Sequence, residues 1–377
     1  MKLAHLADLH LGFRQFDKTN RAGANQREAD VAEAFKRAVD GVLAAQPDVV
    51  LIAGDLFHAV RPPNSAILAM FAQLQRLRGV PVLAVSGNHD TPRSAETASI
   101  LGLYRALGVQ LAQGQVERFV LDGLTVTAVP SAAARTVGTL DPVPGTRNVL
   151  LLHAAIPKEI EVSALDRGWD YCALGDYHVA HQVGPRAWYA GSLDYVATNA
   201  WGELAEEAER GLPGKGWLLV ELGEGEPVVT FQPIEPPRRV LSLPAIDATN
   251  LGAADIDAAL AATLGAVELA GAWARLVVEN VSLITKRSID HQALRRLKAA
   301  ALNLQIEWRR PAAEAPTVAA RAVRMRRLDQ IVDAFLGDRQ LPEDVDRDRL
   351  RALGQQYVEQ AAGAEDPYSG LPVQGVA

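Results

Sequence analysis

Aspartates and histidines recur in five short segments of the first half of this sequence, and each segment follows an apolar run. Oxygen and imidazole donors together suit manganese, iron or zinc, and a set without cysteine argues against a structural zinc site. Two such ions bridged by one carboxylate stabilise both oxygens of an in-line displacement at phosphorus. Asp55 is the candidate bridge, because it is central in the order of the segments and follows a glycine. The segments are Asp8-Leu9-His10, Gly54-Asp55-Leu56-Phe57-His58, Gly87-Asn88-His89-Asp90, His153 and Gly175-Asp176-Tyr177-His178.

The spacing within two of these segments suggests how their side chains reach one site. Alternate residues of a strand share a face, so Asp8 and His10 are expected to point at one site if the extended geometry continues beyond the strand. The same argument applies to Asp176 and His178. Each signal alone has a plainer interpretation, such as a surface turn, or for His153 a hydrogen-bonded histidine near the core. The five segments together, all at strand ends of one α/β fold, favour a catalytic metal site.

The elements that position these residues alternate between strand and helix over the first 130 residues. Apolar runs typical of strands lie at residues 2–7, 49–53 and 80–85. A helix between the first two is predicted by apolar residues at helical spacing, Val31, Phe35, Val39 and Val42. From about residue 116 to 233 the pattern shifts toward strands, and the sheet is expected to continue there. The fold class is therefore a layered α/β sandwich with the site at its strand ends.

Two stretches rich in proline divide the remainder of the chain. After the first, the sequence follows a β-α-β-α-β pattern, which predicts a small α+β domain. After the second, two helical patterns at about 318–336 and 346–361 predict a helical pair. This pair has too little apolar surface for a core of its own and is expected to dock on a partner or on the first domain. The predicted first domain, small domain and helical segment comprise residues 1–235, 239–310 and 317–377.

Composition and charge restrict the class of protein. The 377 residues carry a net charge of -7, and the sequence has no apolar run of the roughly 20 residues that span a bilayer. Asp8 comes too early for a signal peptide and the single Cys172 cannot form an internal disulfide, so a cytoplasmic protein is expected. Cys172 lies in an apolar run, which favours packing. Residues 286–327 carry eleven basic and three acidic side chains, which suit either a solvated helix face or contact with a DNA backbone.

At the five segments the sequence resembles the calcineurin-like metallophosphoesterases and, within them, the SbcD nucleases, which are counterparts of the meiotic-recombination nuclease of double-strand-break repair. The resemblance covers nearly the whole chain. It implies a metal-dependent exonuclease and endonuclease for DNA repair and recombination. A phosphoesterase for a small phosphodiester or phosphomonoester is the alternative, and a non-catalytic scaffold is a second one. The motifs that carry the resemblance are His5-Leu6-Ala7-Asp8-Leu9-His10-Leu11-Gly12, Ala53-Gly54-Asp55-Leu56-Phe57-His58, Gly87-Asn88-His89-Asp90, Ala173-Leu174-Gly175-Asp176-Tyr177-His178 and Ala190-Gly191-Ser192-Leu193.

Position by position, the resemblance implies two divalent ions, Mn²⁺ foremost, with Mg²⁺, Fe²⁺ and Zn²⁺ as alternatives. The family has histidine where Asp176 stands, so Asp176 is either a direct ligand or a neighbour of a weaker second ion. His181 is either a surface histidine or a replacement for the missing ligand. The implied ligands are Asp8, His10, Asp55 and His178 for one ion, and Asp55, Asn88, His153 and Asp176 for the other.

The resemblance also implies roles beyond metal ligation. His89 would contact the scissile phosphate and assist the leaving oxygen, with Asp90 orienting its ring. His58 would either guide the DNA strand or form a plain cap. The small domain would track DNA, with phosphate contacts expected from Lys286, Arg287, Arg295 and Arg296.

The resemblance further implies two protein partners. The helical segment 317–377 would contact the coiled coil of an SbcC-type ABC ATPase. Helices at about 64–78 and 94–107 would form a homodimer, although core packing explains their apolar residues equally well. Those apolar residues are Ile67, Leu68, Phe71, Leu74, Leu101 and Leu103.

Overall fold

A computed structural model describes the chain over residues 1–92, 98–311, 336 and 346–363. Six strands form the first sheet, namely β1 (Lys2–Leu6), β2 (Val49–Ala53), β3 (Val82–Val85), β4 (Gln110–Ala112), β11 (Gly216–Glu221) and β12 (Val228–Pro233). Their order is β12-β11-β1-β2-β3-β4. Strands β1 to β4 pair in parallel, whereas β11 is antiparallel to both of its neighbours. The parallel pairing brings the carboxyl ends of β1, β2 and β3 to one edge of the sheet.

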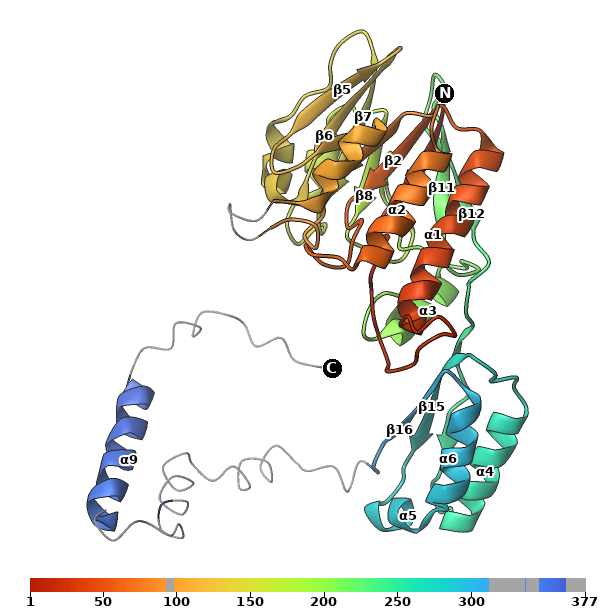
Figure 1. The fold of residues 1–377 in the computed structure, drawn as a ribbon, viewed down its shortest axis with the longest axis vertical. Coiled ribbons are helices and arrows are strands. Elements are labelled where there is room, and N and C mark those ends of the chain that lie inside the picture. The colour runs from red at the N-terminus through yellow and green to blue at the C-terminus, as the bar shows by residue number, and fades with distance from the viewer. Residues whose placement is uncertain (93–97, 312–335, 337–345, 364–377) are drawn as a thin grey trace. The chain divides into compact units, whose positions relative to one another are not determined.

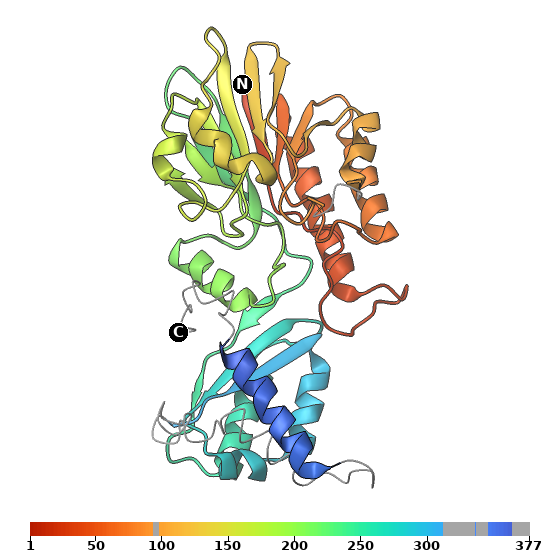
Figure 2. The same ribbon diagram turned by 90° about the vertical axis from the view of Figure 1, so that its left-hand side faces the viewer.

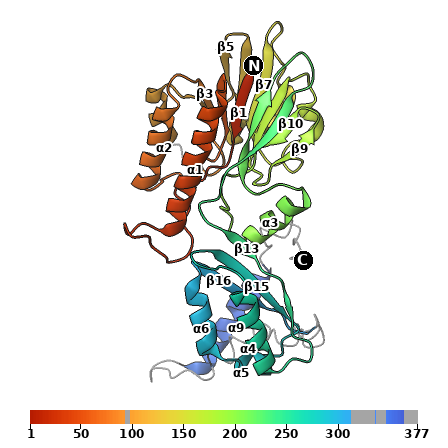
Figure 3. The ribbon, with the colours of Figure 1, turned by 90° about the vertical axis from the view of Figure 1, so that its right-hand side faces the viewer.

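Helices α1 (Gln26–Ala45) and α2 (Asn64–Arg76) lie side by side on one face of this sheet, as Figures 1 and 3 show. The Asn25 side chain caps α1 by accepting from two amides of its first turn. The 3-10 helix η1 (Ile100–Leu107) follows on the same side of the core. The apolar stripe predicted for α1 is confirmed as buried at Val31, Phe35, Val39 and Val42.

A second sheet packs against the other face of the first (Figure 2). Its strands are β5 (Glu117–Leu121), β6 (Leu124–Val129), β7 (Arg147–His153), β8 (Tyr171–Gly175), β9 (His181–Gly184) and β10 (Ala187–Tyr189). The order is β5-β6-β7-β8-β10-β9. The expectation that the first sheet continues to residue 233 is therefore wrong except for β11 and β12. The cause is that β6, β7 and β8 are buried on both faces, so their sequences are continuous apolar runs like those of the parallel strands in the first sheet. The layered α/β sandwich itself is confirmed.

The segment after the first proline-rich stretch forms a four-stranded sheet in which every pair is parallel. The predicted β-α-β-α-β pattern is present, with a two-residue strand and one short helix in addition. Helices α4 and α6 pack together, and α6 also packs on β16. The elements are β13 (Val240–Ser242), β14 (Ile246–Asp247), α4 (Ala253–Gly265), β15 (Trp273–Glu279), α5 (Leu283–Ser288), α6 (His291–Ala300) and β16 (Asn303–Trp308).

Helix α9 (Arg347–Gly363) confirms the second of the two helices predicted for the C-terminal segment. The first, at about 318–336, lies outside the described residues except for its last position. By their contacts, residues 1–279 and 287–308 belong to one unit, and residues 280–286 and those from 309 onward to another. The predicted domain boundaries at 235, 239, 310 and 317 stay predictions. In the part of the chain that the structure describes, no helix has the length and apolarity needed to cross a membrane.

Candidate metal centre

Two loops that leave neighbouring strands run together at the sheet edge and create the centre of the site. The amide of Asp8 donates to the Gly54 carbonyl at 3.1 Å, and the amide of His10 donates to the Asp55 carbonyl at 2.9 Å. Asp8, His10 and Asp55 have φ values of 52°, 44° and 48°, so the backbone is left-handed at all three. The expected extended geometry beyond β1 is wrong, since the strand ends at Leu6. Left-handed residues, which cost roughly 1–3 kcal/mol each, turn these side chains into the site instead.

Glycines allow the loops to approach this closely. A Cβ atom at Gly87 would overlap the Asp55 carboxylate, and one at Gly54, where φ is +89°, would overlap the His153 ring. Any larger residue at either position would therefore displace a candidate ligand. These two glycines explain how side chains from β2, β3 and β7 meet at one place.

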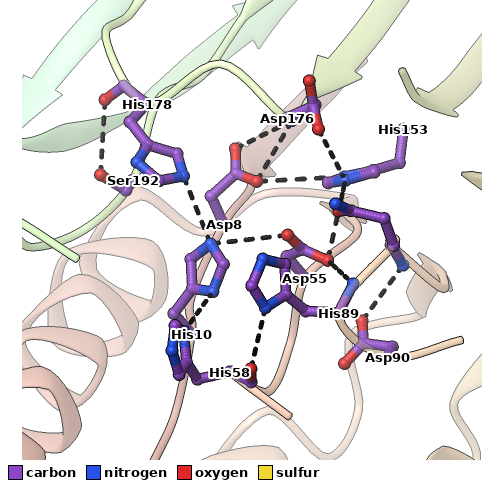
Figure 4. Close-up of polar contacts among 12 residues, drawn as sticks. Asp8, His10, Asp55, His58, His89, Asp90, His153, Asp176, His178 and Ser192 are labelled. Carbon is purple, nitrogen blue, oxygen red and sulfur yellow. Dashed lines mark hydrogen bonds and ion pairs between the residues drawn. The ribbon is translucent and has the colours of Figure 1, made fainter. Parts of the chain in front are cut away.

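Asp8, His10 and His178 form the first group of donors. One ligand atom from each lies within 4.8 Å of the others. The Nε2 atoms of His10 and His178 face each other at 3.3 Å, and His10 Nε2 lies 3.5 Å from Asp55 Oδ2. Figure 4 shows these side chains converging on Asp55. Three of the predicted ligands and the predicted bridge are thus neighbours.

The other oxygen of Asp55 faces a second group of donors. His153 Nε2 lies 3.7 Å from Asp55 Oδ1, 3.5 Å from Asp176 Oδ1 and 3.0 Å from Asn88 Oδ1. His153 Nδ1 donates to the Ala53 carbonyl at 2.8 Å, which turns Nε2 toward the site. Asp55, Asp8 and His153 also satisfy the distance criterion for a metal group. Asp55 therefore lies between two sets of donors (Figure 4).

The carboxylates of the site attract positive charge. Burial raises the pKa of Asp8 to about 6. Burial opposes a charge on His153, but its hydrogen bond to Asp176 and the charges of Asp55 and Asp8 raise its pKa to about 10. Burial and the neighbouring rings together hold the pKa of His10 well below its usual value. In the metal-free site the carboxylates thus hold a proton on His153, which an ion would have to displace, whereas His10 stays neutral, the form that binds metals.

The position of Asn88 tests whether this donor set fits divalent ions. One end of its side-chain amide lies 3.0 Å from His153 Nε2 and 3.2 and 3.0 Å from the two oxygens of Asp55. Without an ion the amide nitrogen in this position donates to these neighbours, and a turn of the amide places its oxygen there as a ligand for an ion. The donors are carboxylate, amide and imidazole atoms, which suit Mn²⁺, Fe²⁺ or Zn²⁺. The residues therefore fit the metal ions that the sequence predicts.

Three imidazoles form a third group beside the two donor sets. Ring nitrogens of His10, His58 and His89 lie within 4.8 Å of one another, and the Nδ1 atoms of His58 and His10 are 3.3 Å apart. His89 Nδ1 pairs with the His58 carbonyl at 2.8 Å, and the His89 amide donates to Asp55 Oδ1 at 2.9 Å. The ring of His58 therefore belongs to the site. His89, His58 and Asp176 are half-buried and Asn88 is exposed, so the site opens to solvent on their side.

The predicted contact between Asp90 and the His89 ring is wrong. Asp90 is buried, and its Oδ2 accepts from the amides of Leu56 at 2.9 Å and Gly87 at 3.1 Å. Its Oδ1 accepts from the amide of Phe57 at 2.9 Å. The ring of His89 is held by the His58 carbonyl instead. Asp90 joins the loop after β3 to the loop after β2, because backbone amides in a buried turn must find an acceptor.

We expect Asp90→Ala to destabilise the fold rather than to redirect His89. The substitution leaves three buried amides without an acceptor, which costs at least about 2 kcal/mol. Urea unfolding of the metal-free protein measures this loss, and Asp17→Ala, at an exposed position, is the control. Unchanged stability together with a reoriented His89 ring would contradict this role.

Two further residues have a definite place in the structure. His181 is half-buried, with its ring stacked on Tyr189 at 5.0 Å and its Nδ1 paired with the Val179 carbonyl at 2.9 Å. It lies in none of the metal groups found among the described residues, so neither a plain surface histidine nor a replacement ligand is supported. Cys172 is fully buried, as expected for packing, and burial raises the pKa of its thiol.

Sequence reasoning missed the residues behind His178. Its Nδ1 lies 3.0 Å from Glu203 Oε1, and Lys215 Nζ lies 2.6 Å from Glu203 Oε2. The amide of Ser192 donates to the His178 carbonyl at 3.0 Å, which gives the Gly-Ser-Leu motif a structural role. Glu203 is 25 residues from His178 in the sequence, and no motif connects them. The sequence predicts strands in this region and no helix, so only the four-residue spacing of Glu203 and Glu207 could have pointed to these side chains.

The sequence is similar to a family of phosphoesterases and to several DNA repair proteins. The family model of calcineurin-like phosphoesterases matches residues 1–191, half of the chain. The DNA double-strand break repair protein Mre11 of Saccharolobus solfataricus is 26% identical over 253 residues, covering 61% of this chain and 62% of its own length. Mre11 of Methanococcus maripaludis is 25% identical, covering 62% and 67%, and Mre11 of Aeropyrum pernix is 30% identical, covering 63% and 61%.

The chain therefore spans about three fifths to two thirds of the length of these curated relatives. Among solved structures, the calcineurin-like phosphoesterase YfkN of Bacillus subtilis aligns with 61% of this chain and 88% of its own, at 12% identity and a TM-score of 0.31, a likeness too low to carry an argument. The match of the family model to the strands and loops that carry the donor groups decides the assignment: the chain belongs to the calcineurin-like phosphoesterase family.

Proposed function

We propose that this chain is a two-metal DNA nuclease that hydrolyses phosphodiester bonds. The observation that carries the proposal is the position of Asp55, whose two oxygens face two separate donor sets at 3.5 and 3.7 Å. One carboxylate shared by two ions is the arrangement that phosphoryl-transfer sites use. The Mre11 relatives, named for DNA double-strand break repair, support DNA as the substrate.

The proposed ligand sets are those that the sequence implied, with Mn²⁺ as the first candidate ion. Asp176 is proposed as a direct ligand, since its Oδ1 lies 3.5 Å from His153 Nε2 on the open side of the site. Its backbone amide also donates to both oxygens of Asp8 at 3.1 Å, which ties the two sets together. The sets are Asp8, His10, Asp55 and His178 for one ion, and Asp55, Asn88, His153 and Asp176 for the other.

The protein's own residues position the substrate and move a proton. When bound, the ions supply Lewis acidity toward the phosphoryl oxygens and toward water. The contact of His89 Nδ1 with the His58 carbonyl at 2.8 Å makes Nδ1 the donor and leaves Nε2 for the substrate. In its imidazolium form the ring also carries a proton on Nε2, and transfer of this proton to the departing sugar oxygen leaves a neutral ring, which is general acid catalysis. The ring of His58, whose centroid lies 5.0 Å from that of His89, limits the path of the strand.

The proposal is tested by comparing two substrates with the same purified protein. Linear duplex DNA with Mn²⁺ should be degraded, and bis-p-nitrophenyl phosphate should be hydrolysed more slowly. The Asp55→Asn protein, prepared identically, excludes a contaminating nuclease. Hydrolysis of the small ester alone would support a phosphoesterase without DNA, and activity on neither substrate would support a non-catalytic scaffold.

Exposed arginines on α6 are proposed to contact the DNA backbone. Arg295 and Arg296 are both exposed on this helix, which lies within the basic stretch of residues 286–327. Replacing both by serine should weaken DNA binding and lower the slope of log K against log salt by about 1 per arginine. Fluorescence anisotropy over a salt series measures this. An unchanged slope would assign these side chains to a solvated helix face, and hydrolysis of the small ester serves as the control.

We also propose two assemblies and a location. Leu353 and Tyr357 on α9 are 46% and 64% exposed and four residues apart, so they present one apolar strip to a partner such as the coiled coil of an SbcC-type ATPase. Leu68, Phe71 and Leu103 are exposed on α2 and η1 and support a homodimer, whereas Leu74 and Leu101 belong to the core. A cytoplasmic location agrees with a DNA substrate.

A further inference from the structure

The side of His178 that faces away from the site is held by charged residues of a single helix and one lysine. Helix α3 (Ala200–Glu209) presents Glu203 and Glu207 on one face. His178 Nδ1 lies 3.0 Å from Glu203 Oε1. Lys215 Nζ lies 2.6 Å from Glu203 Oε2 and 2.9 Å from Glu207 Oε1. The same ammonium donates to the His178 carbonyl at 2.8 Å. Lys215 thus fixes both the backbone of His178 and the partner of its ring.

Glu203 determines which nitrogen of His178 can bind an ion. A carboxylate accepts hydrogen bonds and cannot donate them, so the ring must carry its proton on Nδ1. Nε2 then presents a lone pair to the site, where it faces His10 Nε2 at 3.3 Å. In the opposite tautomer a lone pair on Nδ1 would face the Glu203 carboxylate, and a proton on Nε2 would block the ion. The carboxylate therefore selects the form of the ring that can act as a ligand.

Lys215 keeps Glu203 in the geometry that this selection requires. Its side chain is only 3% exposed, and a buried ammonium is retained only when it is paired on several sides. Glu207 is bound in turn by the Tyr195 hydroxyl at 2.6 Å, and the Lys215 ammonium lies 4.7 Å from the centre of the Tyr195 ring. The lysine therefore has little freedom to move. A rigid outer partner is what a pre-organised metal ligand needs.

We infer that Glu203, anchored by Lys215, is the positioning residue for the metal ligand His178. This inference rests on the proposed metal centre and extends it beyond the residues that touch the ions. It predicts that the ion held by Asp8, His10, Asp55 and His178 depends on Glu203, whereas the ion held by Asn88, His153 and Asp176 does not. An ion pair that only stabilises the fold would affect neither ion selectively.

The first experiment determines which ring nitrogen of His178 carries the proton in the metal-free protein. Nitrogen-15 spectra of selectively labelled histidine should show a proton on Nδ1 in the parent protein, with His178→Gln used to identify the signal. In Glu203→Ala the proton should move largely to Nε2, the form that histidine prefers without a partner. Glu203→Gln, which keeps an acceptor of the same shape, should give an intermediate result. Glu209→Gln, at an exposed position of the same helix, should match the parent.

The second experiment measures the number of bound Mn²⁺ ions and the affinity of each site by titration. In Glu203→Ala one of the two sites should weaken by about 10- to 100-fold, while the other keeps its affinity. In the His178→Gln background the same substitution should add nothing, because Glu203 acts through His178. Thermal unfolding of each metal-free variant confirms that it is folded, and Glu203→Gln carries the test if Glu203→Ala is not.

The outcomes distinguish a failure of the role inferred for Glu203 from a failure of the proposed metal centre. Two Mn²⁺ ions bound with parental affinity by Glu203→Ala, with Nδ1 still protonated, would overturn the inference and leave the metal centre intact. Equal weakening of both sites would also overturn it, since it would mean a general structural role. If the parent protein itself bound no Mn²⁺, the metal centre would fail, while the ring of His178 would still report whether Glu203 sets its tautomer.

Discussion

Replacing Asp55 by asparagine should abolish hydrolysis of DNA and reduce the number of bound Mn²⁺ ions from two to at most one. The carboxylate faces His10 with one oxygen and His153 with the other, at 3.5 and 3.7 Å. Asparagine preserves the shape of the side chain but offers only one oxygen and no charge, so it cannot bridge two ions. The rate should fall at least on the order of a thousandfold, because loss of a mere outer partner already costs about 10- to 100-fold.

Two measurements distinguish this loss from unfolding. Mn²⁺ should raise the unfolding temperature of the parent protein, since a ligand that binds only the folded state stabilises it. The same addition should leave the Asp55→Asn protein nearly unchanged, although the metal-free variant remains folded. Asp48→Asn, outside the site and paired with the Lys2 amide at 2.7 Å, is the matched control. Retention of two tightly bound ions by Asp55→Asn would contradict the bridging role.

Replacing His89 by glutamine should lower the rate on DNA by about 10²- to 10⁴-fold and leave both Mn²⁺ ions in place. The ring is oriented by the His58 carbonyl, and its Nε2 is the proposed donor to the leaving oxygen. The loss should be much smaller on bis-p-nitrophenyl phosphate, because nitrophenolate departs without a proton. Rates on the two substrates, measured with the same preparations, give this difference directly.

The controls for His89 address a competing role for the ring. Nitrogens of His10, His58 and His89 lie within 4.8 Å of one another, so these three side chains are themselves a candidate metal group. A loss of one ion in His89→Gln would assign His89 as a ligand and contradict its role as an acid. His181→Gln, whose ring stacks on Tyr189 outside this group, should change neither rate nor affinity by more than about twofold.

The positions of the donor residues were predictable because each lies at the end of an apolar strand or within a few residues of it. Parallel strands bring their carboxyl ends together, so the sequence alone predicts that Asp8, Asp55 and His89 lie at one edge of the sheet. The stripe of α1, with Val31 and Phe35 buried against the sheet, followed from helical periodicity in the same way. Local pattern and strand order together were sufficient for this much of the site.

Strand alternation does not, however, bring Asp8 and His10 together. Alternation along a strand was expected to align them, but the strand ends at Leu6 and both residues have positive φ. A left-handed backbone at aspartate or histidine is stabilised by contacts from other segments, here the hydrogen bonds that the amides of Asp8 and His10 donate to the carbonyls of Gly54 and Asp55. Such contacts join residues more than forty positions apart, and no short window of sequence contains them.

Roles that depend on the choice of a hydrogen-bond partner were the least predictable. Asp90 follows His89 directly and was expected to orient its ring, yet it binds backbone amides across the two loops. Glu203 and Lys215, which hold His178, belong to no sequence motif. Glu203 lies on α3, and Lys215 directly precedes β11, so both are at least 25 residues from His178 in the sequence. The second sheet was also missed, because its strands β6, β7 and β8 are buried on both faces like those of the first sheet.

Crystals soaked in Mn²⁺ and measured at the manganese absorption edge provide the most direct test of a two-metal site built around Asp55. The account predicts two anomalous peaks, with Asp55 contacting both ions, His178 contacting one and Asp176 contacting the other. A single peak, or a peak held by His10, His58 and His89 with Asp55 outside its coordination, would contradict it.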